Sequence, residues 1–388
     1  MPSIIPGAGR GIISGRRLVT TMPIETVPTI LINNRISQAT ALKNYVFYSG
    51  EEHIDMISWG AGSLYNHQQE PSVHHYWDDE LVKHSSTIQD LPYSNFTKTL
   101  FQVSEPVAVG TELSIYYGDN WFQRFNASHL RGDSKSNAVE TTDHQGHDSS
   151  PPRVVEAQDM RRFGHCLSHV HVAASTVEHA GSGLFAGKPF VKGDVVVVSP
   201  VLTLPKSIID SEEGVLRNYC FASRESNMVL FPLNNGAMIN HNSAGPANVR
   251  IDWYSWLEAY RAIASKYHSR QEEGIDIKSG VFDLAYLLAL SVEELFGYSF
   301  AALDLSFIAT RDITADEEIF LDYGSEWEHA WSRYQQELSV FQSSSASQRS
   351  CSDGDAGSSP SDQCQALGDA PVFKQYIAVP EGFYPQHW

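Results

Sequence analysis

An ordered internal repeat constrains this sequence more than any other feature. Four short motifs of the first third return in the same order further along the chain. Because the order is kept, the repeat predicts duplication of a whole domain. The pairs are Gly9-Arg10-Gly11 with Gly181-Ser182-Gly183, Asn44-Tyr45-Val46-Phe47 with Asn218-Tyr219-Cys220-Phe221, Asn66-His67 with Asn240-His241, and Tyr117-Gly118 with Tyr323-Gly324.

The spacing of the motifs locates an insertion in the second copy. The glycine elements lie 172 residues apart and the Asn-His pairs 174. The Tyr-Gly pairs lie 206 residues apart, and so do the tryptophans that follow them, Trp121 and Trp327. The increase in offset from 174 to 206 residues places 32 additional residues in the second copy, after Trp253.

The insertion is predicted to be helical, whereas both copies are predicted to be rich in strands. Trp256, Tyr260, Ile263 and Tyr267 fall on one face of a helix, and a second apolar helical segment runs from 282 to 296. Short runs rich in Val, Ile and Leu, such as 194–198 and 304–309, are separated by Gly, Pro and Asp. No alternation of strands and helices predicts a doubly wound sheet, so a nucleotide-binding fold of that class is not expected.

The whole chain of 388 residues suits two domains with linkers. Residues between the copies, and a stretch after the second copy, are rich in Ser, Gly and Pro and have few large apolar residues. We predict a first domain at 1–126, a flexible linker at 127–165, a second domain at 166–335 with a helical insertion at 254–300, a Ser-rich low-complexity spacer at 336–371 and an aromatic C-terminal tail at 372–388.

Charge and cysteine content limit the partners. The formal net charge of −19 disfavours direct binding to nucleic acid and is compatible with a basic protein partner, although solubility alone also explains it. Four cysteines form no C-x-x-C pair, so no zinc site of that kind is expected. No apolar run approaches the roughly 18 residues that span a bilayer, and no secretion signal is visible. We expect a soluble intracellular protein, in nucleus or cytoplasm, of open oligomeric state.

Each repeated motif has a plain structural interpretation and a functional one. Glycines allow a tight turn or the close approach of a ligand. An Asn-His pair offers neutral donors and acceptors, but a histidine after an apolar run is commonly a core residue. A tyrosine at a strand end can direct its hydroxyl into a cleft or simply pack. A metal site at His165, Cys166, His169 and His171 is a weaker possibility, because alternating His-Val is typical of an ordinary strand.

Taken in order, the glycine element, Asn-His followed by Pro, and Glu-x-x-x-x-Tyr-Gly resemble the SET domain of protein lysine methyltransferases, in two tandem copies. The resemblance covers residues 3 to about 125 and about 168 to 332. It implies a mainly β fold in which the Asn-His strand and the tyrosine segment cross as a pseudoknot. It also implies S-adenosylmethionine as cofactor and a lysine-containing protein as substrate, with a narrow channel between the two binding faces.

The resemblance assigns roles to residues of both copies. It implies that Tyr117 and Tyr323 align the lysine amine for methyl transfer. The remaining implied residues contact the cofactor: Gly9, Arg10, Gly11, Asn66, His67 and Trp121 in the first copy, and Gly181, Ser182, Gly183, Asn240, His241 and Trp327 in the second.

Three departures from the family pattern leave questions open. Gln68 and Asn242 stand where a cysteine often follows Asn-His, and the cysteine-rich zinc segment that follows many SET domains is absent. Ile115 and Leu321 occupy the position that helps to set the degree of methylation, so mono-, di- and trimethylation all stay open. A non-catalytic SET-like module that binds a protein partner is the alternative function, and one or both copies could be active.

Overall fold

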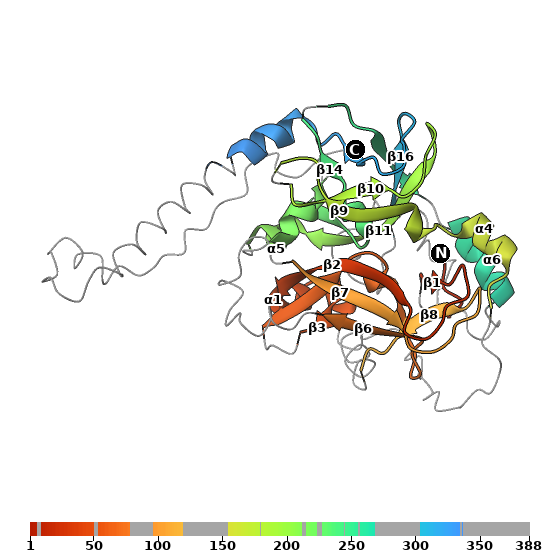
Figure 1. Cartoon of the computed structure of the whole chain (residues 1–388). Coiled ribbons are helices and arrows are strands. Elements are labelled where there is room, and N and C mark those ends of the chain that lie inside the picture. Colours follow the sequence, from red (N-terminus) through yellow and green to blue (C-terminus); the bar gives the residue numbers. More distant parts are fainter. Residues whose placement is uncertain are drawn as a thin grey trace, which may run out of the picture.

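A computed structural model gives the architecture of the chain (Figure 1). It is mainly β, with few helices, as the sequence predicts. The structure describes residues 1–5, 9–49, 53–77, 96–118, 154–178, 180–211, 215–222, 227–243, 245–254, 257–267, 303–333 and 336. Within these ranges no helix is long and apolar enough to cross a membrane.

The first copy is built on a five-stranded antiparallel sheet in the order β3-β4-β2-β7-β6. A second, three-stranded sheet has the order β1-β8-β5. The strands are β1 (Ile12–Ile13), β2 (Pro23–Asn33), β3 (Phe47–Tyr48), β4 (Ile54–Ser58), β5 (Asn66–His67), β6 (Val73–Trp77), β7 (Phe96–Val103) and β8 (Glu112–Ile115).

The second copy repeats this order of strands. Its sheet runs β12-β13-β11-β16-β15-β17-β14, and β9 and β10 form a separate hairpin. The long central strands β2 and β11 correspond, and each carries a bulge at the same place, before Glu25 and before Val197. The strands are β9 (Val170–Ala174), β10 (Ser182–Ala186), β11 (Val195–Pro205), β12 (Phe221–Ala222), β13 (Met228–Pro232), β14 (Asn240–His241), β15 (Val249–Tyr254), β16 (Leu303–Ala309) and β17 (Phe320–Leu321).

Short helices connect and cover the strands. The α-helices are α1 (Asn34–Gln38), α4 (Ala157–Phe163), α5 (Lys206–Ser211) and α6 (Leu257–Tyr267), and residues 325–333 are also helical. The 3₁₀ helices are η1 (Ala41–Asn44), η2 (Gly62–Leu64), η4 (Leu167–His169), η5 (Val215–Tyr219) and η6 (Asn235–Met238). Helix α6 confirms the start of the predicted helical insertion, and the second predicted helix at 282–296 lies outside the described residues.

One hydrophobic cluster contains buried residues of both copies. Trp59 of the first copy is fully buried, its indole Nε1 donates to the carbonyl oxygen of Pro232 at 3.3 Å, and its ring lies 4.7 Å from that of Tyr219. The contacts are reciprocal, because η5 lies against β2 and η1 lies against β11. Exchange of equivalent elements in this way is the mark of a two-fold interface, here within a single chain. The copies therefore pack as a pseudo-dimer.

Residues from Val154 onward, within the predicted flexible linker, belong to the folded structure. Val154 pairs with Thr111, and the Val155 amide donates to the Gly110 carbonyl at 2.8 Å. Helix α4 follows and packs on α6, and Figure 1 shows both helices beside the N-terminal strand β1. The linker up to 153, the Ser-rich spacer beyond Gln336 and the aromatic tail lie outside the described residues. The proposed domain limits stay a prediction.

Candidate functional site

Each Asn-His pair lies beside its own glycine element and its own glutamate. Asn66 Nδ2 donates to the Arg10 carbonyl at 2.8 Å and to Glu112 Oε1 at 2.6 Å. In the second copy, Asn240 Nδ2 donates to the Ser182 carbonyl at 2.9 Å and to Glu318 Oε1 at 3.2 Å. Because all four partners are acceptors, they fix the amide orientation. Within the described residues no donor reaches either Oδ1, which leaves two equivalent acceptor positions.

A serine and a backbone amide complete the ring of donors around each glutamate. Ser3 Oγ donates to Glu112 Oε1 at 2.7 Å, and the Ile4 amide donates to Oε2 at 2.8 Å. Both carboxylates are only 4% exposed, so these donors compensate the cost of burying them. Burial still raises the pKa of Glu112, while the bonds from Asn66, Ser3 and Ile4 lower it.

The second copy reproduces this ring of donors. Ser175 Oγ donates to Glu318 Oε1 at 2.7 Å, and the Thr176 amide donates to Oε2 at 2.6 Å. Thr176 adds its side-chain hydroxyl to the same oxygen, a contact that Ile4 cannot make.

The glutamates explain the second glycine of each repeated element. A Cβ on Gly11 would lie 2.2 Å from Glu112 Oε1, and one on Gly183 would lie 2.1 Å from Glu318 Oε1. The first glycine has a different reason, because Gly9 and Gly181 have φ of 72° and 73°, which side chains disfavour. Both glycines are therefore required by the local structure, whether or not a ligand binds.

The histidines hold the tyrosine segments in place. Strand β5 pairs in parallel with β8, and β14 with β17, which brings each Asn-His pair beside the segment that leads to the tyrosine. The amides of Tyr117 and Tyr323 each donate at 3.0 Å to Nδ1 of His67 and His241. In the second copy His241 Nε2 also lies 2.9 Å from Glu328 Oε1. Since Nδ1 accepts, Nε2 carries the proton that bonds to Glu328.

Each tyrosine hydroxyl donates to a backbone carbonyl next to the Asn-His pair. Tyr117 donates to the Tyr65 carbonyl and Tyr323 to the Ile239 carbonyl, each at 2.5 Å. Burial raises the pKa of both phenols far above the usual range. At neutral pH both groups are therefore neutral, and each oxygen keeps lone pairs that can accept a hydrogen bond.

Aromatic rings surround Tyr323 of the second copy. The Trp327 ring lies edge-on at 4.8 Å, His241 is stacked at 5.5 Å and Phe221 lies edge-on at 6.1 Å. Trp331 stacks on Trp327 at 5.5 Å. Trp327 and Phe221 thus form an apolar wall around the Tyr323 ring. Trp121, the counterpart of Trp327, lies outside the described residues.

In each copy the structure thus brings together the described residues to which the resemblance assigned a role. It also adds partners to which no role was assigned, although each recurs at the offset of its own motif. These additional residues are Ser3 with Ser175, Glu112 with Glu318, and Phe221. Glu112 and Glu318 are the glutamates of the repeated Glu-x-x-x-x-Tyr-Gly motif, whereas Ser3 and Ser175 are marked in the sequence only by sharing the offset of 172 residues with the glycine elements.

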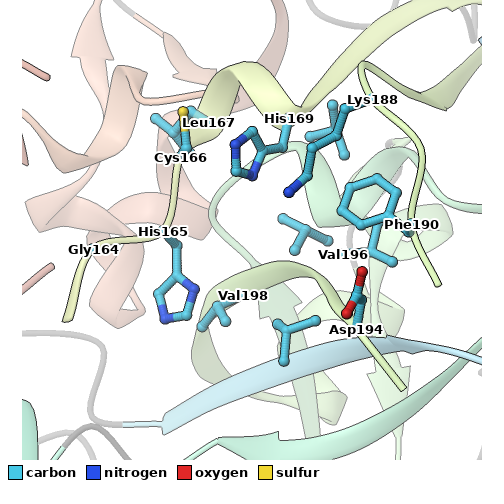
Figure 2. A pocket seen from close by; sticks show the side chains of 13 residues that line it. Gly164, His165, Cys166, Leu167, His169, Lys188, Phe190, Asp194, Val196 and Val198 are labelled. Atoms are coloured by element: carbon cyan, nitrogen blue, oxygen red, sulfur yellow. The ribbon is translucent and has the colours of Figure 1, made fainter. Parts of the chain in front are cut away.

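The possible metal ligands do not converge. Among the described residues no group of three or more His, Cys, Asp or Glu could hold a metal ion. His165 Nε2 bonds to the Tyr254 hydroxyl at 3.0 Å, and the His171 ring stacks on Phe185 at 5.8 Å. His165, Cys166 and His169 instead line a pocket of about 250 Å³ against Val195–Val198 (Figure 2). None of the repeated Asn, His or Tyr residues lines this pocket.

No protein-family model matches the sequence, and no curated protein matches it. The structure has distant matches among SET-domain methyltransferases. A candidate histone methyltransferase of Plasmodium falciparum is 23% identical, with a TM-score of 0.22, over 30% of this chain and 96% of that one. Polycomb repressive complex 2 of Chaetomium thermophilum, bound to S-adenosylmethionine, is 19% identical with a TM-score of 0.26. That match covers 42% of this chain and 16% of the other.

Proposed function

We propose that this protein transfers methyl groups from S-adenosylmethionine to lysine side chains of a protein substrate, with the second copy as the principal site. The observation that carries the proposal is the joint position of Asn240, His241 and Tyr323. The histidine binds the tyrosine backbone, and the tyrosine hydroxyl binds the carbonyl that precedes the asparagine. These are the residues on which the resemblance to SET domains rests.

The residues present fit the cofactor. Asn240 Oδ1 has no donor within the described residues and can accept from an ammonium group, and Trp327 and His241 provide flat aromatic rings for an aromatic base. Gly181 and Ser182 are exposed, so their backbone is accessible. When bound, the cofactor supplies an electrophilic methyl group on a sulfonium centre.

Tyr323 would orient the lysine amine. Its hydroxyl hydrogen is committed to the Ile239 carbonyl, so the oxygen can only accept from an N–H of the amine. The raised pKa excludes tyrosinate as a general base at neutral pH. The lysine ammonium group, whose ordinary pKa is near 10.4, must therefore lose a proton to solvent before methyl transfer. The apolar wall around Tyr323 favours the neutral amine. Alignment then supplies most of the rate enhancement.

Incubation of the purified chain with labelled S-adenosylmethionine and a cell extract tests the proposal. We expect label on lysine residues of a protein, and a large loss of label with Tyr323→Phe. Thermal denaturation with the cofactor alone gives an independent measurement, because a ligand at 100 times its Kd stabilises a fold by about 2.7 kcal/mol. No label and no stabilisation would instead support a non-catalytic interaction module.

A further inference from the structure

The two glycine elements differ in what covers them. Asn66 and Asn240 are both half-buried, and both glutamates are buried. Gly9, however, is buried, whereas its counterpart Gly181 is exposed. The segment that precedes each glycine element follows the same pattern.

Ser3 is 1% exposed and Ile4 6%. Their counterparts are more open, since Ser175 is half-buried and Thr176 exposed. The copies thus keep the polar network around the asparagine and differ on the face formed by the glycine element and the segment before it.

Two helices without a counterpart in the repeat cover this face of the first copy. Ile4 belongs to a buried cluster with Val155, Phe163, Ala259 and Ile263. Val155 and Phe163 come from the segment between the copies, whereas Ala259 and Ile263 lie in α6 of the insertion. The insertion of the second copy therefore reaches across to the first (Figure 1).

Polar contacts fasten the two helices to each other. Lys266 Nζ lies 2.8 Å from Asp159 Oδ2 and 2.9 Å from Glu156 Oε2. The Tyr267 hydroxyl donates to Asp159 Oδ2 at 2.8 Å and accepts from the Glu156 amide at 2.9 Å. The cover is thus one unit in which each helix supports the other.

Arg10 ties the first glycine element to the second copy. Its guanidinium lies 2.7 Å from Asp304 Oδ1, with side-chain exposures of 11% and 2%. Asp304 lies in β16 and pairs in register with Tyr254, close to the start of α6. Ser182, at the position equivalent to Arg10, is too short for such a contact and is exposed.

We propose that the first copy is the structural half of the pseudo-dimer, with its glycine face converted into an internal interface, and that S-adenosylmethionine binds only to the second copy. This inference rests on the function proposed above. The bound cofactor would make its contacts at Gly181, Ser182 and Asn240, and the equivalent surface of the first copy would stay occupied by α4 and α6.

Isothermal titration calorimetry of the full-length chain with S-adenosylmethionine tests the inference without any substitution. We expect one equivalent bound per chain. Two equivalents would overturn the structural role of the first copy but leave the proposed function intact. The absence of binding would overturn the proposed function, and the inference with it.

Hydrogen–deuterium exchange of the same sample then locates the ligand. We expect protection in peptides that cover 180–186 and 236–243, and unchanged exchange in peptides that cover 9–14 and 62–67. The Asn240→Ala variant should lose the heat of binding, with its near-UV circular dichroism as the control for folding. One equivalent that persists in a folded Asn240→Ala variant would place the site elsewhere and overturn the inference.

Discussion

Around Asn66 the serine and the segment before the glycines are buried beneath two helices, whereas around Asn240 the equivalent positions are open or half-buried. The hydrogen bonds inside the two networks are nevertheless nearly the same. A fold that buries a glutamate must supply hydrogen-bond donors to its carboxylate, whether or not a ligand ever binds. The hydrogen-bond network is therefore present in both copies because the fold requires it. Solvent accessibility is what distinguishes the candidate site around Asn240 from the equivalent position around Asn66.

The largest expected effect comes from substituting Arg10, which contacts Asp304 of the second copy. Ser182, at the equivalent position, is too short for such a contact. Arg10→Met leaves the Asp304 carboxylate buried without its partner and should cost about 3–5 kcal/mol of unfolding free energy. Chemical denaturation measures it. Adding Asp304→Asn should recover most of the loss, because no unpaired charge remains.

The exposed pair of Arg250 and Asp252 supplies the control for that experiment. Its side chains are 57% and 52% exposed, so Arg250→Met should cost about 0–1 kcal/mol. The loss in Arg10→Met should also shrink at acid pH. Burial raises the pKa of Asp304, and the protonated carboxyl needs no counter-charge as the pH falls below that pKa. A cost below 1 kcal/mol at neutral pH would show that Arg10 does not fasten the copies.

The second effect separates the two tyrosines. Tyr323→Phe removes the oxygen that would hold the amine and should lower the single-turnover rate of methyl transfer by about 100- to 1000-fold, or about 2.7–4 kcal/mol of barrier. Tyr117→Phe should cost much less. The midpoint of chemical denaturation serves as the control, since each variant loses one equivalent bond to a carbonyl. Equal losses of rate would mean that both copies turn over.

The third effect should be equal in the two copies. Gly11→Ala and Gly183→Ala each place a Cβ against a buried carboxylate, at 2.2 and 2.1 Å, and should each cost about 1–3 kcal/mol. Gly15→Ala is the matched control, because a Cβ there meets nothing within 4 Å. Thermal denaturation of the three variants measures the effect. A cost in only one copy would mean that the glutamates do not set the same constraint.

The order and spacing of motifs predicted much of the fold. The strand-rich copies, the helix at 257–267 and the approach of Asn66 to the tyrosine segment all agree with the sequence. The shared core was not predictable in this way. Trp59 is one apolar residue among many, and its packing on Tyr219 depends on how two surfaces fit together, which leaves no periodic pattern.

The covering of the first site left no signal in the sequence either. Arg10 and Asp304 are ordinary charged residues far apart in the chain, and only the fold brings them within 2.7 Å. The apolar face predicted for the insertion helix did show that this helix packs against something. It could not show that the surface it covers belongs to the other copy, because an amphipathic pattern does not identify its partner.

The smallest effect concerns Glu25, a carboxyl group of the first copy that bonds to Tyr65. Glu25 accepts from the Ala61 amide at 2.9 Å and from the Tyr65 hydroxyl at 3.3 Å. The equivalent residues of the second copy, Val197 and Ile239, are apolar and buried. Burial raises the pKa of Glu25 to about 7, so the folded first copy favours the protonated acid.

Because the folded pKa lies above the unfolded value of 4.5, this contribution to stability is full below 4.5 and is lost as the pH rises through about 7. Glu25 is half-buried, so water moderates the effect to about 1–2 kcal/mol. Denaturation midpoints at pH 5 and pH 8 should therefore differ less in Glu25→Gln than in the parent chain. Parallel pH profiles would mean that Glu25 is already ionised in the fold. A reduced pH dependence would show that a protonated acid bonds to the hydroxyl of Tyr65, the residue whose carbonyl accepts from Tyr117, whereas the equivalent positions of the second copy hold the apolar residues Val197 and Ile239.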